Sequence, residues 1–252
     1  MSGFRWLRNA LLIPAAAACL ASSCADKPGD PSVTLAGTAF RGVPPAPAGT
    51  TPAEWPAYAH DNAGTKYSPV DQINRGNVQQ LKIAWRWTSV DNSVRESDEY
   101  LRTTMFEATP IMIRNTLFFT TAFTRAVALD AATGKPSWIH DPQSHHFGTR
   151  TPIGIHSRGV SYWRGGDDER IVFGTSDGYL MALDAKTGAP AAGFGESGKV
   201  DLTVGLGRSV DRRFYSVTSP PVICGDVIVV GSWIPDMPIK ADSARPSWRQ
   251  AP

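Results

Sequence analysis

A short sequence, Ala-Leu-Asp-Ala-x-Thr-Gly, occurs twice, at residues 128–134 and again at residues 182–188. Apolar residues precede each copy, so it predicts the end of one β-strand, a turn and the start of the next strand. In such a turn the Asp side chain caps backbone amides, and the Gly adopts the positive φ that the turn needs. A repeat at this spacing predicts a modular fold in which each unit buries a surface against its neighbour.

Short runs of strand-forming residues follow one another along the chain. Hairpins are predicted between residues 109–113 and 116–121, around Arg114 and Asn115, and between residues 222–224 and 227–231. Other strands are predicted at residues 83–88, 126–129, 137–140, 160–163, 171–175 and 179–183, with a polar loop at 164–170. Many short strands with a repeat of this length predict an all-β fold and favour a β-propeller over a β-sandwich.

Tryptophan residues stand near the ends of the repeated units. Trp138, and Trp85 or Trp87 before it, are predicted to pack as flat wedges between neighbouring units, because aromatic residues at repeat spacing are usually core residues. Phe194 stands near the corresponding place in the second repeat. Residues 77–81 are predicted to form a short helical turn.

The first 24 residues have the features of an export signal. Arg5 and Arg8 precede an apolar run at residues 10–20 that is too short to span a bilayer. Leu-Ala-Ser-Ser-Cys at residues 20–24 resembles a bacterial lipobox, in which Cys24 would carry a lipid anchor. The alternative is an ordinary signal peptide cut near Ser23. Both interpretations predict a periplasmic protein, and only the first attaches it to a membrane.

The composition excludes some classes of protein. The 25 Lys and Arg residues nearly balance the 23 Asp and Glu residues, so no nucleic-acid-binding surface is indicated. Of the three cysteines, only Cys224 lies in the predicted folded part, so no disulfide framework is expected. Residues 25–54 are predicted to be a flexible linker rich in Pro and Gly, and residues 55–239 to be the folded domain. Residues 240–252 lose the strand pattern and suggest a truncated or frameshifted end.

Two segments carry a resemblance to a known family. Residues 55–87 contain Trp-Pro-Ala-Tyr, Tyr-Ser-Pro-Val-Asp-Gln-Ile-Asn and Asn-Val-Gln-Gln-Leu-Lys-Ile-Ala-Trp, and residues 158–163 read Arg-Gly-Val-Ser-Tyr-Trp. They resemble segments of the dehydrogenases that depend on pyrroloquinoline quinone (PQQ), in particular the membrane glucose dehydrogenase-like branch. The resemblance implies an eight-bladed quinoprotein-type β-propeller, of which this chain would hold about three to four blades.

The same resemblance implies cofactors, substrates and site residues. The cofactors would be PQQ and Ca²⁺ or Mg²⁺, the substrate a sugar, polyol or alcohol, and the electron acceptor a membrane quinone or a cytochrome. Arg158 would pair with PQQ, because a guanidinium fork suits a carboxylate or quinone oxygen. Glu107 and Thr218 match further cofactor contacts. Ser219 would replace Thr218 if the register shifts by one residue.

Two further positions are implied less directly. Phe123 stands where the glucose dehydrogenase relatives carry a histidine near the cofactor; it could form a flat wall but cannot donate a hydrogen bond. Asp236 falls where the family has its first acidic metal ligand. His156 and Ser157 stand where the alcohol-oxidising branch has a cysteine pair, which favours a sugar or polyol substrate.

Two functions from different classes follow from these patterns. The first is an exported PQQ-dependent dehydrogenase, which transfers a hydride from its substrate to a metal-activated quinone. Because the family's catalytic aspartate has no match in the chain, this hypothesis describes an incomplete, individually inactive N-terminal part. The alternative is a non-catalytic propeller lipoprotein that acts as a scaffold in outer-membrane protein assembly. Arg158, Glu107 and Thr218 favour the dehydrogenase, because a scaffold needs none of them.

Overall fold

The computed structural model describes residues 54–61, 63–97, 105–147, 155–207, 209–225 and 227–234. The predicted export signal with Cys24, the linker up to residue 53, Asp236 and the tail at residues 240–252 lie outside these ranges. No helix within the described ranges is long and apolar enough to cross a membrane.

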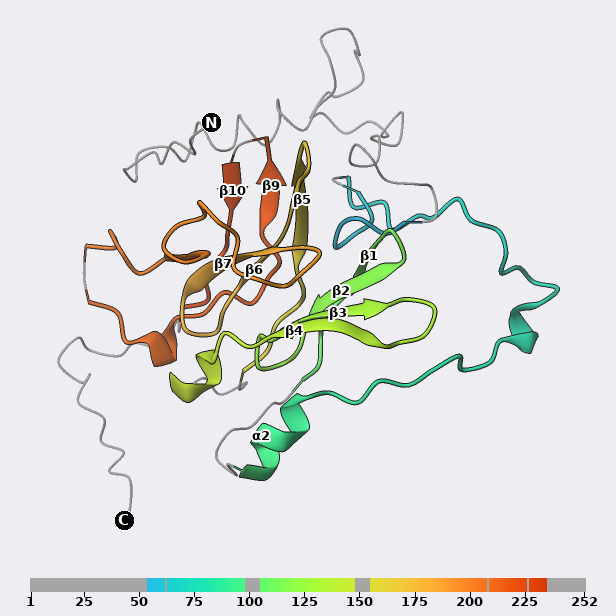
Figure 1. The fold of residues 1–252 in the computed structure, drawn as a ribbon, viewed down its shortest axis with the longest axis horizontal. Coiled ribbons are helices and arrows are strands. Elements are labelled where there is room, and N and C mark those ends of the chain that lie inside the picture. The colour runs from blue at the N-terminus through green and yellow to red at the C-terminus, as the bar shows by residue number, and fades with distance from the viewer. Residues whose placement is uncertain are drawn as a thin grey trace, which may run out of the picture.

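The chain folds into consecutive antiparallel sheets (Figure 1). The strands of the first four-stranded sheet are β1 (Ile111–Ile113), β2 (Thr116–Thr120), β3 (Ala126–Asp130) and β4 (Pro136–His140). Those of the second are β5 (Ser161–Gly165), β6 (Asp168–Gly174), β7 (Tyr179–Asp184) and β8 (Lys199–Asp201). A hairpin of β9 (Val222–Cys224) and β10 (Val227–Val229) follows. The predicted partial propeller is confirmed, with two complete four-stranded blades and one hairpin among the described residues.

The blades stack face to face, because alternate residues of each strand point to opposite sides of the sheet. Phe118 of β2 shares a core with Phe173 and Leu183 of the second sheet. The neighbouring Phe119 points the other way and packs with Trp85 and Trp87. Ala182, on the far face of the second sheet, belongs to a core that also contacts the β9–β10 hairpin. Each blade is therefore buried on both faces, which explains its nearly continuous apolar strands.

The repeated seven-residue motif forms the same turn in both blades. Asp130 accepts hydrogen bonds from the backbone and side chain of Thr133, at 2.8 and 2.7 Å, and Asp184 accepts the equivalent bonds from Thr187, both at 2.8 Å. Burial tends to raise the pKa of Asp184, but the hydrogen bonds from Thr187 outweigh it and hold the pKa below its usual value. The predicted turn chemistry is confirmed.

The predicted tryptophan wedges are confirmed too. The Trp138 indole donates a 3.1 Å hydrogen bond to the carbonyl of Ala185, in the repeat turn of the next blade. Trp85 donates a 3.0 Å bond to the carbonyl of Ala131, in the equivalent turn of the first blade. Phe194 is buried in the core between the second sheet and the β9–β10 hairpin. Aromatic side chains thus join each unit to the following one.

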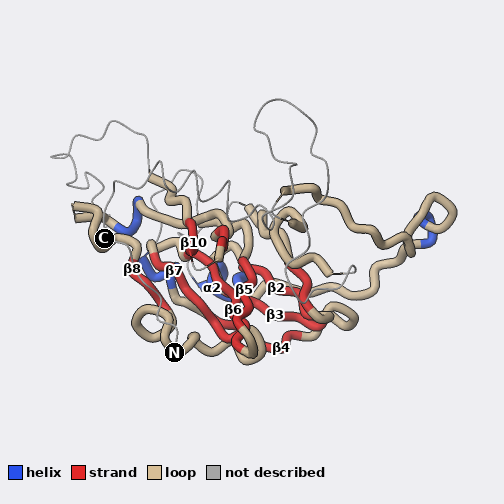
Figure 2. The backbone as a smooth tube through the Cα atoms, turned by 90° about the horizontal axis from the view of Figure 1, so that it is seen from above, coloured by secondary structure: helices blue, strands red, loops and turns tan. Residues whose placement is uncertain are grey.

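One strand prediction and one loop prediction were wrong. Residues 83–88 form no strand and have no sheet partner among the described residues. The segment before them reaches away from the sheets (Figure 2) and carries exposed apolar side chains, including Ile73 and Leu81. The predicted loop at residues 164–170 is mostly strand, because β5 and β6 pair as far as Gly165 and Asp168. Backbone pairing does not need apolar side chains, so a polar strand end escapes a search by pattern.

The helices are short. Within the described ranges they are the 3₁₀ turns η1 (Val78–Gln80), η2 (Ser144–Phe147) and η3 (Arg212–Phe214) and the α-helix α2 (Asp91–Ser97). The 3₁₀ turn η1 confirms the helical turn predicted at residues 77–81, whereas α2 had no sequence signal. The helix α2 lies beside the first sheet, near the turn between β2 and β3 (Figure 1).

Candidate functional site

Three of the predicted site residues stand at equivalent places in the fold. Glu107, Arg158 and Thr218 each lie a few residues before the first strand of a sheet, namely β1, β5 and β9. Backbone hydrogen bonds join these segments: the Thr109 amide donates to the Arg158 carbonyl at 3.0 Å, and the Arg158 amide donates to the Thr218 carbonyl at 2.8 Å. The backbone of Arg158 therefore joins all three segments. The segment that carries Glu107 lies on one side of it, and the segment that carries Thr218 lies on the other.

The side chains meet at the same point. Arg158 Nη1 donates to Thr218 Oγ1 at 2.9 Å, and Arg158 Nε lies 3.3 Å from Glu107 Oε2. The ion pair is poorly aligned for a hydrogen bond, so the buried Glu107 Oε2 has no hydrogen-bond partner among the described residues. The side chains of Arg158 and Glu107 are 38% and 30% exposed. The cluster therefore combines an accessible cation, a hydroxyl and a carboxylate oxygen with spare acceptor capacity.

Ser219 was the alternative to Thr218 if the register shifted. Ser219 is exposed, and Thr218 is the residue that contacts Arg158 through both its backbone and its side chain. Thr218, and not Ser219, is therefore the residue that belongs to the Arg158 cluster.

Two residues that hold the Arg158 segment in place, Gly159 and Ser157, were not predicted from the sequence. Gly159 has a φ of 134°, and a Cβ atom there would lie 2.9 Å from the Thr109 carbonyl oxygen, so only glycine fits without strain. Ser157 Oγ and Thr120 Oγ1 lie 2.7 Å apart and share a buried hydrogen bond. The glycine after Arg158 was a visible signal for a close backbone approach. The Ser157 contact had none, because its partner is distant in the chain.

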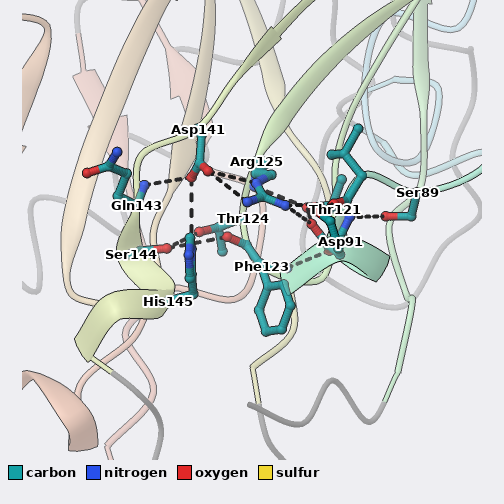
Figure 3. Close-up of polar contacts among 12 residues, drawn as sticks. Ser89, Asp91, Thr121, Phe123, Thr124, Arg125, Asp141, Gln143, Ser144 and His145 are labelled. Atoms are coloured by element: carbon teal, nitrogen blue, oxygen red, sulfur yellow. Dashed lines mark hydrogen bonds and ion pairs between the residues drawn. The ribbon is translucent and has the colours of Figure 1, made fainter. Parts of the chain in front are cut away.

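Phe123 lies in a different cluster (Figure 3). Its side chain is fully buried, its ring centroid lies 5.7 Å from that of His145, and its amide donates to Asp91 Oδ2 at 3.1 Å. The structure does not bring Phe123 together with Arg158, and a fully buried ring offers no free face to a planar ligand.

The cluster around Phe123 is built on a buried arginine (Figure 3). Arg125 Nη1 lies 3.2 Å from Asp91 Oδ1, and Arg125 Nε donates to Asp141 Oδ2 at 2.9 Å. Thr121 Oγ1 also donates to Asp91, at 2.9 Å. Burial lowers the pKa of the nearby His145 imidazole. Arg125 thus ties α2 and the loop after β4 to the turn between β2 and β3, which indicates a structural role for this cluster.

Within the ranges that the structure describes, no group of three or more His, Cys, Asp or Glu side chains is arranged so that it could hold a metal ion. The predicted metal ligand Asp236 lies outside those ranges. His145 and His146 lie in η2.

Comparison with known proteins identifies the class of protein. The family model described as "Glucose/ethanol/alcohol dehydrogenase, beta-propeller domain" matches residues 55–246. The chain therefore belongs to the family of PQQ-dependent dehydrogenase β-propellers, as the Arg-Gly-Val-Ser-Tyr-Trp sequence and the segment at residues 55–87 predicted.

The similar proteins include glucose dehydrogenases and alcohol dehydrogenases. The chain is 34% identical over 216 residues to quinoprotein glucose dehydrogenase of Gluconobacter oxydans, which covers 79% of this chain and 26% of that protein. It is 38% identical over 141 residues to the dehydrogenase subunit of the alcohol dehydrogenase (quinone) of the same organism, covering 56% of this chain and 17% of that protein. The crystallised quinohemoprotein alcohol dehydrogenase of Pseudomonas putida HK5 matches with a TM-score of 0.57 and 31% identity, over 72% of this chain and 23% of that one. The chain thus spans about a quarter of the length of these glucose dehydrogenase and quinohemoprotein relatives.

Proposed function

We propose that this chain forms part of a PQQ-dependent dehydrogenase that oxidises a sugar, polyol or alcohol, and that Arg158, Glu107 and Thr218 contact the cofactor. The observation that carries the proposal is the convergence of these three side chains from the starts of three successive sheets. A scaffold protein would need the backbone bonds between these segments. It would not need a partly exposed guanidinium held between a carboxylate and a hydroxyl.

The residues present fit the chemistry of the cofactor. PQQ is a planar tricarboxylate, so its site needs a cation and hydrogen-bond donors. Arg158 has five N–H donors, and its described contacts are those with Glu107 and Thr218. Donors therefore remain for an anion. Thr218 Oγ1 accepts from Arg158, which leaves its own O–H free to donate to a ligand. When bound, PQQ supplies the two-electron acceptor for the hydride of the substrate.

Each residue then has a defined task. Arg158 holds a carboxylate or quinone oxygen, Glu107 orients the guanidinium, and Thr218 adds a directed hydroxyl donor. Asp236 is proposed as a ligand of Ca²⁺ or Mg²⁺ on the resemblance alone. No catalytic base is assigned, because the family's aspartate has no match in the chain.

The proposal also covers location and electron transfer. The predicted export signal supports a periplasmic protein, with Cys24 as a lipid anchor if the lipobox is used. The electrons would then pass to a membrane quinone or a cytochrome.

A titration of the full chain with PQQ in the presence of Ca²⁺, followed by the absorption of the cofactor, tests the site. We expect Arg158→Ala to weaken PQQ binding at least about tenfold, because it removes charge-assisted hydrogen bonds. Arg164→Ala is the matched control. Arg164 is an exposed arginine near the other end of β5 and should leave the affinity unchanged. Dye-linked oxidation of glucose and simple alcohols by this chain alone should stay undetectable, because the family's catalytic aspartate has no match in it.

Two results would contradict the proposal. Failure to bind PQQ by a chain extended to the length of these relatives would favour a non-catalytic propeller. Equal PQQ binding by the wild type and Arg158→Ala would show that the family assignment is right but that the site lies elsewhere.

A further inference from the structure

A recess of about 260 Å³ opens between the first and second sheets. It lies near the end of β5 that is remote from Arg158, because Glu169 on its wall pairs in the sheet with Arg164. The side chains that give it its chemistry are Arg114, Ser137, Trp138, Tyr162, Glu169 and Lys186. All of them belong to the two complete blades, so the recess does not depend on the Arg158 cluster or on any part of the chain outside the described residues.

One wall of the recess consists of three interacting polar side chains. Arg114 forms an ion pair with Glu169, and the Glu169 side chain is 6% exposed whereas that of Arg114 is 47% exposed. The Tyr162 phenol interacts with both, and burial together with the Glu169 carboxylate raises its pKa. A guanidinium, a carboxylate and a phenol thus stand together with their positions fixed, offering both donors and acceptors.

The facing wall is flat and apolar. The Trp138 ring packs 5.9 Å from Phe118, and its N–H is already used in the bond to Ala185. Trp138 therefore presents only carbon atoms to the recess, and it is held rigidly. Ser137 adds a hydroxyl beside the ring. A rigid aromatic surface next to a few placed polar groups is the usual composition of a small-molecule site.

Lys186 gives the recess an excess positive charge. It occupies the variable position of the repeated motif, where the first blade has Ala132. Lys186 is exposed and makes no ion pair within 4 Å among the described residues, although it interacts at longer range with Asp184. The Asp184 Oδ1 atom accepts hydrogen bonds from the amide and the hydroxyl of Thr187. With Arg114 neutralised by Glu169, the Lys186 ammonium remains available to an anion.

We propose that this recess binds a small polyhydroxylated carboxylate, such as a sugar acid. Its carboxylate would pair with Lys186, its hydroxyl groups would bond to the Arg114–Glu169–Tyr162 group and Ser137, and its C–H face would lie on Trp138. A neutral sugar would leave Lys186 unused. A simple carboxylate would leave the buried polar wall unused. The site is separate from the proposed PQQ site and goes beyond the proposed function.

Calorimetric titration of the full chain with sodium gluconate tests this site. Glucose, which has the hydroxyl groups without the carboxylate, and acetate, which has the carboxylate without the hydroxyl groups, are the comparison ligands. We expect gluconate to bind more tightly than either. Lys186→Gln should weaken gluconate binding about fivefold and leave glucose binding unchanged, since an exposed ion pair is worth up to about that factor. Lys135→Gln is the matched control, because Lys135 is an exposed lysine beside the equivalent turn of the first blade and does not line the recess.

A second variant, Ser137→Tyr, should abolish gluconate binding by filling the recess while the circular dichroism spectrum and the urea unfolding midpoint stay unchanged. The proposal is overturned if no gluconate binding is detected. It is overturned as well if gluconate binds no more tightly than glucose and acetate, or if Lys186→Gln and Lys135→Gln behave alike. Because these outcomes are read without PQQ, they do not depend on the result of the PQQ titration.

Discussion

The indole ring of Trp138 lies directly against the bare Cα of Gly188, so a Cβ atom there would come within 2.6 Å of Cδ2. The same relationship joins Trp85 and Gly134, at 2.5 Å. In both blades the glycine of the repeated motif is the surface on which the tryptophan of the preceding unit rests. The motif is therefore part of the interface between blades as well as a turn, which explains why it recurs together with its tryptophan.

Gly188→Ala should destabilise the protein by about 2–4 kcal/mol. Gly188 has a φ of 71°, which strains any residue with a Cβ, and the new methyl group also forces Trp138 to move. Urea unfolding followed by tryptophan fluorescence measures the loss.

Gly166→Ala is the control for backbone strain. Gly166 has a similar φ of 64°, but nothing lies within 4 Å of the position of its Cβ. It should lose only about 1–2 kcal/mol. If both variants lost the same free energy, the contact between Trp138 and Gly188 would contribute nothing to stability.

Arg125→Met should destabilise the protein by about 3–5 kcal/mol, because it leaves Asp91 buried without its cation. The comparison is Arg213→Met, which breaks a half-exposed ion pair with Asp211 and should cost less than about 1 kcal/mol. Thermal and urea unfolding of both variants gives the two values. A loss for Arg125→Met no larger than for Arg213→Met would show that water replaces the cation beside Asp91.

The contribution of Asp177 to the free energy of unfolding should fall as the pH rises. Burial raises its pKa above the ordinary value of 3.8, so the folded state binds this proton more tightly than the unfolded state does. Its contribution to the free energy of unfolding is therefore greatest below pH 3.8 and declines as the pH rises through the raised pKa. In Asp177→Asn the amide oxygen still accepts the hydrogen bond from Thr175. The variant should gain stability relative to the wild type over this window.

Asp184→Asn should behave in the opposite way, because the pKa of Asp184 is lowered despite burial. The stability that this carboxylate contributes is present above its unfolded pKa and is lost as the pH falls through the folded pKa. Unfolding of both variants from acid to neutral pH should give differences from the wild type with opposite slopes. Parallel slopes would refute the assignment for one of the two carboxylates.

The hydrogen bond between Ser157 and Thr120 should contribute about 1 kcal/mol of coupling in a double-mutant cycle of Ser157→Ala and Thr120→Val. Both hydroxyls are buried, so each single variant leaves one of them unpaired. The cycle of Ser157→Ala with Thr116→Val, near the other end of β2, should be additive. Measurable coupling in the second cycle and none in the first would rule out this bond as a support for Arg158.

Local patterns determined much of this protein. The strands, the repeated turns and the tryptophan wedges follow from apolar alternation, from Asp and Gly at fixed offsets and from aromatic spacing, all of which act between residues close in the chain. Glu107, Arg158 and Thr218 were found by resemblance to the family. That they meet could not be derived from the sequence, since the Arg158–Thr218 contact joins residues from the starts of different sheets.

Contacts between residues distant in the chain decided what surrounds each local turn. Residues 121–125 and 175–179 form the same hydrogen-bonded turn, with bonds of 2.8 and 2.9 Å from the first amide to the last carbonyl. One turn carries the buried Phe123 and the other the buried Asp177.

The sequence by itself favours the turn at residues 175–179, because Gly178 adopts its φ of 87° without strain. In the other turn Thr124 has a φ of 60°, which a β-branched residue disfavours, and its buried hydrogen bond with Ser144 helps to hold it.

The tertiary structure decided which partners surround these turns. Asp141 takes its arginine from Arg125 within the same blade, whereas Asp201 takes Arg212 from the loop after its own blade. A long, charged side chain pairs with the carboxylate that the packing of the sheets places beside it. The distance between the guanidinium and the carboxylate is set only when the blades stack.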